Sequence, residues 1–281
     1  MLPNMPKLTF AILPVVLSSL MPLAAGAQVY KSSDSNSIHP VLTRIPKPKP
    51  ITRENSFGFR MNSDGWSVVY EAGKSVSEDL KRIERFYDVR VFQIELSERH
   101  HPKEVRMYGW DIDHQSDKQY IFGKINNFYA LKGNYLFRKM IAGKPIDGNV
   151  SLHLVYGGGL SIGLLKPYYV NAYVSEDGGQ TFSKKDVGFK PETSPYFLNP
   201  VYVIGASSWG AGLGGIKVVP GLHTKLGMHF DFARQTRVVS AVEVGVTGEL
   251  YSKKIEIMAD QKATAYFFNL YAGIQFGKRH Q

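Results

Sequence analysis

The chain has 281 residues, of which 43% are hydrophobic, 12% aromatic and 21% charged. This composition is typical of a folded protein and excludes wholesale disorder. No cysteine is present, which excludes disulfides, thiolate metal sites and cysteine nucleophiles. The 34 basic and 24 acidic residues give a formal net charge of +10. Because the sequence holds no nucleic-acid-binding module, this charge indicates contact with anionic lipid headgroups or polysaccharide rather than with nucleic acid.

The amino terminus has the pattern of a secretory signal peptide. Lys7 precedes an apolar run at residues 8–23, and the small residues Ala25 and Ala27 follow it. We therefore predict that residues 1–27 form a signal peptide cleaved before Gln28. The alternative is an uncleaved membrane anchor, which is disfavoured because the run is short for a spanning helix and is interrupted by prolines.

Residues 28–53 follow the predicted cleavage site. Prolines alternate with lysines near the end of this stretch, which blocks helix formation and favours extended chain. We predict a flexible periplasmic arm that leads into a single domain at residues 54–281.

From about Asn55 onward, apolar and polar residues alternate along the chain. The clearest case is residues 222–232, where Leu226 and Met228 fall on one face and Lys225 and His229 on the other. Alternation over a stretch this long is typical of a β-strand, and its length suits a tilted membrane-crossing strand of about 9–11 residues. Eight segments show the pattern with varying clarity, at residues 55–62, 66–74, 86–97, 120–137, 150–164, 222–232, 238–250 and 266–276.

These segments predict an all-β fold, namely an antiparallel up-and-down transmembrane β-barrel of about eight strands. Residues 166–217 are the longest connection, and we expect one long external loop there because long loops of outer-membrane barrels face outward. A soluble barrel with its apolar face inward is the alternative. The polar faces favour the membrane barrel, since they hold Gly, Ser, Thr, His and isolated charges instead of the many Lys and Glu residues of a solvated surface.

Charged residues recur on the polar faces of the predicted strands. An eight-stranded barrel is only wide enough for its own side chains to fill it. We therefore expect these charges to pair and to make the interior a hydrogen-bonded plug instead of a pore. They are Arg60, Glu71, Glu95, Lys225, Asp231, Glu243 and Glu249.

Four runs carry a family resemblance: residues 126–131 (NNFYAL), 156–169 (YGGGLSIGLLKPYY), 219–223 (VPGLH) and 268–279 (FNLYAGIQFGKR). From about residue 57 to residue 279, the chain resembles the small outer-membrane β-barrel proteins of Bacteroidota, described as PorT-like or OmpA-barrel-like. The resemblance implies a place in the cell outer membrane, with membrane lipid, lipopolysaccharide and other envelope proteins as partners. It also implies an accessory role in secretion or envelope assembly. The chain departs from many such proteins because a basic tail follows the last aromatic residue, Phe276.

Motifs for catalysis or cofactor binding are weak. Residues 210–215 (GAGLGG) match a dinucleotide-binding glycine pattern, but a strand-like stretch follows where that motif needs a helix. His100 and His101 are adjacent, and because neighbours in a strand point to opposite faces, a solvated loop is favoured over a metal site. The sequence therefore predicts no catalytic residue, no cofactor-binding residue, no cofactor and no metal ligand.

One enzymatic alternative stays open, a lipid-modifying barrel enzyme. Its candidates by residue type are Ser151, His153, His223 and His229. No carboxylate partner is evident from their spacing, so we favour interior side chains hydrogen-bonded to Glu243, Asp231 or Lys225. We expect a non-catalytic structural or interaction component of the cell surface. A soluble periplasmic ligand-binding barrel is the least favoured alternative.

Overall fold

The structure is a computed structural model that describes residues 52–76, 88–111, 118–143, 150–175, 177, 180–233 and 237–280. The predicted signal peptide, residues 1–27, lies outside the described residues, as does the predicted arm as far as residue 51. Within the described ranges, no helix is both long and apolar enough to cross a membrane.

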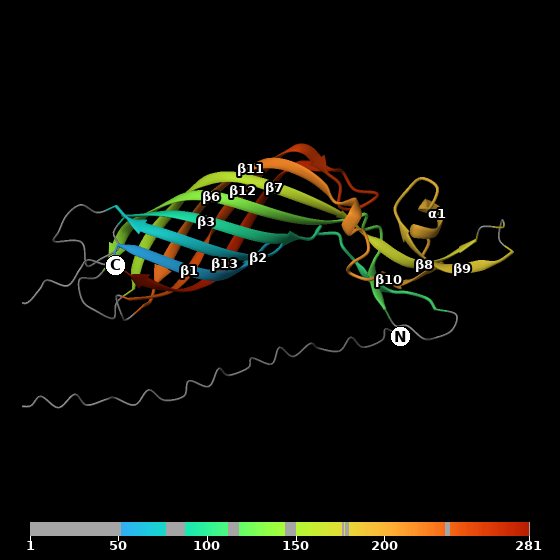
Figure 1. The fold of residues 1–281 in the computed structure, drawn as a ribbon, viewed down its shortest axis with the longest axis horizontal. Coiled ribbons are helices and arrows are strands. Elements are labelled where there is room, and N and C mark those ends of the chain that lie inside the picture. The colour runs from blue at the N-terminus through green and yellow to red at the C-terminus, as the bar shows by residue number, and fades with distance from the viewer. Residues whose placement is uncertain are drawn as a thin grey trace, which may run out of the picture. The chain divides into compact units, whose positions relative to one another are not determined.

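Eight strands close into an antiparallel barrel (Figure 1). They are β1 (Arg53–Asn62), β2 (Gly65–Ser75), β3 (Asp88–Arg99), β6 (Asn126–Gly143), β7 (Ser151–Pro167), β11 (Lys217–Asp231), β12 (Val238–Ile255) and β13 (Thr264–His280). Each pairs with the barrel strands that precede and follow it in the chain, and β1 pairs with β13 to close the barrel, with Phe57 opposite Phe276. The predicted all-β, up-and-down barrel of about eight strands is confirmed.

One predicted strand needs correction. The segment predicted at residues 120–137 is two elements: β5 (Gln119–Ile121) pairs with β4 (Arg106–Tyr108) in a small hairpin, and the barrel strand β6 begins only at Asn126. Between them the chain turns at Gly123, whose φ of 69° lies in the left-handed region that glycine adopts without strain. Apolar residues continue through this turn, so alternation alone did not reveal it.

The connection at residues 166–217, predicted as one long loop, has a fold of its own. It carries β8 (Tyr169–Ser175), β9 (Phe182–Gly188) and β10 (Val203–Ala206), which form a three-stranded sheet in the order β10-β8-β9. A short helix, α1 (Ser194–Phe197), and a 3-10 turn, η1 (Leu213–Gly215), complete it. These strands have seven residues or fewer, which is too short for the alternation that marks the barrel strands.

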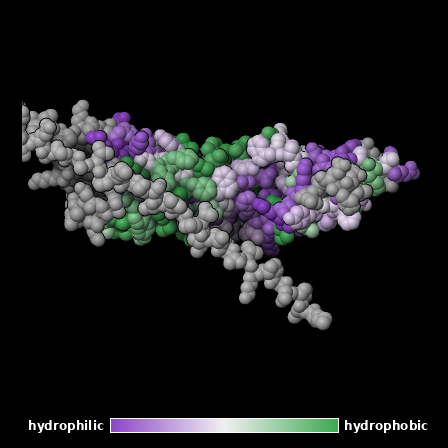
Figure 2. Space-filling view, turned by 90° about the horizontal axis from the view of Figure 1, so that it is seen from below, coloured by the Kyte–Doolittle hydropathy of each residue, from purple (hydrophilic) through white to green (hydrophobic). Residues whose placement is uncertain are grey.

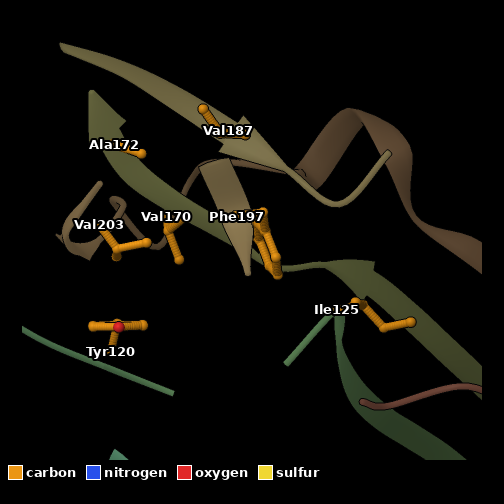
Figure 3. Close-up of a cluster of buried hydrophobic side chains, with 7 residues drawn as sticks. All are labelled: Tyr120, Ile125, Val170, Ala172, Val187, Phe197 and Val203. Atoms are coloured by element: carbon orange, nitrogen blue, oxygen red, sulfur yellow. The ribbon is translucent and has the colours of Figure 1, made fainter. Parts of the chain in front are cut away.

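Three connections at one end of the barrel pack together, and we call their described residues the cap. They belong to residues 100–125, 168–216 and 256–263. Backbone hydrogen bonds join them, from Trp110 N to Val203 O at 2.9 Å and from Ile125 N to Ile257 O at 2.8 Å. The cap has a hydrophobic core of its own (Figure 3), made by Tyr120, Ile125, Val170, Ala172, Val187, Phe197 and Val203.

The two ends of the barrel differ. At the cap end, only the β1–β2 turn at residues 63–64 is tight, and the other connections form the cap. At the opposite end, which we call the base end, the links are residues 76–87, 144–150 and 232–237. The two longest connections, residues 100–125 and 168–216, therefore lie at the same end of the barrel.

Candidate functional site

The outer wall of the barrel is apolar. Leu226 and Met228 of β11 are 51% and 42% exposed, whereas their neighbours Lys225 and His229 are only 3% and 1% exposed. The predicted faces of this strand are therefore confirmed. Figure 2 shows a hydrophobic band over the barrel strands with hydrophilic residues beyond it. Other exposed apolar side chains on this wall are Phe57, Phe59, Phe92, Ile94, Leu131, Leu160, Leu222, Phe268, Leu270 and Ile274.

The interior of the barrel is filled with ion pairs centred on Arg60. Its Nη1 atom donates to Glu95 at 2.9 Å, and its Nη2 atom donates to both Glu71 and Glu243 at 3.0 Å. All four side chains are almost completely buried. Lys225 adds a second cation, with its Nζ atom 2.5 Å from Glu243.

This network continues toward the cap end of the barrel. The Nζ atom of Lys132 lies 2.9 Å from Glu95 and 2.6 Å from Glu249. Arg99 pairs with Glu249 and with Asp64 in the β1–β2 turn.

Toward the base end, two more arginines complete the network. Arg138 pairs with Glu54 and, at 2.6 Å, with Glu71. Arg279 pairs with Glu54 at 3.2 Å and with Asp231. Charged side chains therefore link carboxylates along the interior, as expected for a barrel that its own side chains fill.

The seven charged residues predicted for the interior are all buried and all take part in ion pairs. The prediction that these charges pair is therefore confirmed. Four further cations of the network were not predicted, namely Arg99, Lys132, Arg138 and Arg279. The signal for two of them was present, because Lys132 and Arg138 alternate with the apolar residues Leu131 and Phe137 of β6.

Three of the candidates for a lipid-modifying site, His153, His223 and His229, are buried in the interior of the barrel. His229 Nδ1 lies 3.4 Å from Glu243, one of its predicted partners, whereas His223 Nδ1 lies 2.8 Å from Asn134, which was not predicted. The rings of His153 and His229 are 5.9 Å apart. In the pairing of β7 with β11, Ser151 lies opposite Asp231 and His153 lies opposite His229.

The motifs judged weak in the sequence lie in the cap. Residues 210–215 end in η1 and lead into strand β11, so the helix that a dinucleotide site needs does not follow. His100 Nδ1 lies 3.3 Å from Glu104, and this hydrogen bond raises the pKa of His100. Burial favours a higher pKa for Glu104, but its contacts with His100, the His101 amide and Lys124 outweigh burial and bring it to about 2. No cluster suited to a metal ion occurs among the residues described.

The surface of the cap presents large apolar side chains to solvent. Trp110 is 63% exposed and Trp209 is 71% exposed. The Trp110 amide is bonded to β10, and the Trp209 ring lies 4.6 Å from Lys166 Nζ, which also donates to its carbonyl. Val105, Tyr108 and Val201 are exposed as well. Aromatic residues, tryptophan and tyrosine above all, are enriched among the residues that contribute most to protein–protein binding.

Comparisons with known proteins give distant likenesses in fold alone. No family model matches the chain, and no curated protein does. Among solved structures, Neisserial surface protein A is 10% identical, with a TM-score of 0.33 over 80% of this chain and 94% of that one. The N-terminal β-barrel domain of Pseudomonas aeruginosa OprF is 10% identical, with a TM-score of 0.31 over 82% and 98%. Ail of Yersinia pestis is 10% identical, with a TM-score of 0.31 over 82% and 99%. At this level of similarity the solved structures do not indicate a function for this chain. We therefore infer its function from the geometry of the chain itself.

Proposed function

We propose that this chain is an outer-membrane β-barrel protein without catalytic activity that binds a partner at the cell surface through its cap. The observation that carries the proposal is the polarity of the barrel. Apolar side chains cover the outside of its strands, and ion pairs fill the inside.

A soluble barrel would show the opposite polarity. Fully burying one large apolar side chain is worth about 1.5–3 kcal/mol, so a soluble fold would turn Phe57, Leu226 and Phe276 inward. Instead they stand on the outer wall, where only a lipid environment would remove them from water. The backbone of a closed barrel suits that environment, because every strand is paired on both sides.

The place of the two longest connections, both in the cap, supports an orientation with the cap outward. Outer-membrane barrels have short periplasmic turns and longer extracellular loops. The base end would then face the periplasm, in keeping with the export predicted from residues 1–27. From the resemblance to PorT-like proteins of Bacteroidota, we further propose that the protein contacts lipopolysaccharide. The same resemblance suggests an accessory role in secretion or envelope assembly.

The cap is the part of the chain best suited to recognition. Its core of residues from separate connections holds the surface in one shape, and Tyr108, Trp110 and Trp209 are exposed on it. An envelope protein or another surface component is the partner that we propose.

Surface labelling tests this orientation. An epitope tag inserted at Gly178, in the β8–β9 connection, should be labelled by antibody on intact cells. The matched control is a tag at Ile146, in the β6–β7 connection at the base end, which should be labelled only after permeabilisation. The reverse pattern would overturn the orientation.

A further inference from the structure

A row of basic side chains crosses four neighbouring strands on the outer wall at the base end. Arg53 of β1 lies opposite His280 of β13 on one side and Lys74 of β2 on the other. Lys74 in turn lies opposite Arg90 of β3. All four side chains are exposed, and we call these residues the basic row.

The charges of the basic row are not compensated within the described residues. Arg53, Lys74 and Arg90 form no ion pair there, and the nearby exposed acid, Asp88, lies opposite Lys139 of β6. The Cβ atoms of residues directly opposite each other on one face of a sheet are about 4.5–5.5 Å apart, and like charges in such pairs destabilise the sheet. Three cations in neighbouring positions therefore favour an anion that can contact more than one of them.

The basic row lies at the edge of the apolar wall. Farther along the same strands, Phe276, Phe57 and Tyr70 lie opposite one another and face outward. A hollow of about 410 Å³ in the outer wall is lined by these three residues together with Lys278 and His280. A second hollow of about 210 Å³ is lined by the cations Arg90 and Lys139, the carboxylate Asp88, and the aromatic residues Phe137 and Tyr156 among others. Cationic and apolar groups therefore meet in both hollows.

We propose that the basic row and these two hollows bind anionic glycerophospholipid, with the phosphate on the row and the acyl chains against the aromatic residues. This inference rests on the proposed function, which places the base end in the periplasmic leaflet. A planar guanidinium group can donate two parallel hydrogen bonds to the oxygens of one phosphate. Each basic residue near an anionic membrane surface adds measurably to the attraction, and the row sets three side by side.

Spin-labelled lipids test the inference directly. The full chain would be reconstituted in phosphatidylcholine vesicles containing a trace of either spin-labelled phosphatidylglycerol or spin-labelled phosphatidylcholine, and the motionally restricted fraction of each label would be measured. We expect a preference of about two- to fivefold for phosphatidylglycerol, which high salt should abolish because the attraction is electrostatic.

Two triple variants make the test specific. Arg53→Gln/Lys74→Gln/Arg90→Gln should bring the preference close to one. Lys118→Gln/Lys190→Gln/Lys262→Gln removes the same charge from exposed positions in the cap and should leave the preference unchanged. Unboiled gel mobility would check that both variants fold.

Three outcomes would count against these ideas in different ways. One is equal restriction of the two lipids by the wild-type protein, and another is a full preference for phosphatidylglycerol in the variant that lacks Arg53, Lys74 and Arg90. Either result would overturn the inference and leave the proposed function standing. Absence of any restricted lipid would show that the barrel is not in the bilayer. It would overturn the proposed function together with the inference.

Discussion

At the scale of single residues, the structure assigns opposite environments to neighbours on the same strand. Leu226 faces outward and Lys225 faces the ion-paired interior. The sequence predicted this division because alternation along residues 222–232 is nearly unbroken. It could not predict which charges meet, since Arg60 and Glu243 are brought together only by closure of the barrel between β1 and β13.

Leu226→Arg should destabilise the barrel. A basic residue on the lipid face near the membrane midplane costs roughly 2–4 kcal/mol, which is a large part of a folding free energy of about 5–15 kcal/mol. The measurement is the free energy of unfolding in lipid vesicles. The matched control is Leu226→Phe with Met228→Phe, which lipid should accept but a close-packed protein interior would resist. Equal damage by the control would mean that this face is a packed core.

Arg60→Gln should be among the most damaging single changes in the barrel. It would leave Glu71, Glu95 and Glu243 with less positive charge around them, and breaking a buried pair by removing one partner costs about 3–5 kcal/mol. The urea midpoint of unfolding should fall well below that of wild type. Arg53→Gln, on the outer wall, serves as the control and should shift the midpoint little. Similar midpoints for the two variants would contradict the central role of Arg60.

At the scale of elements, the long barrel strands could be predicted and the cap could not. Each barrel strand has one side toward the interior and one toward the outside along its whole length, which imposes a period of two on the sequence. The cap strands are short, and their core joins residues from separate connections, such as Tyr120, Phe197 and Val203. No local pattern in the sequence reports such contacts.

Phe197→Ala tests whether the cap folds as a unit on its own core. Phe197 is 2% exposed, and loss of a buried phenylalanine costs about 3–5 kcal/mol. We expect residues 168–216 to become more sensitive to protease while the barrel keeps its folded mobility on unboiled gels. Val201→Ala, at an exposed position of the cap, should change neither. If Phe197→Ala unfolded the whole barrel, the cap and the barrel would unfold together as one cooperative unit.

At the scale of the whole molecule, the interior network bears on transport. Ion pairs connect carboxylates and cations along the interior, from Asp64 near the cap end to Asp231 at the base end. Side chains therefore occupy the space that a water-filled pore would need. The purified barrel should therefore show no steady conductance in planar bilayers. A porin prepared in the same way would provide the positive control. Reproducible single-channel steps from this protein would refute the view of the interior as a plug.

We propose that the apolar wall places this barrel in the outer membrane, and cell fractionation followed by gel electrophoresis tests this proposal. The chain should be recovered with the outer-membrane fraction, and it should migrate differently on a denaturing gel before and after boiling, as folded membrane barrels do. Recovery in the soluble periplasmic fraction, with the same mobility before and after boiling, would show that the barrel does not lie in the membrane.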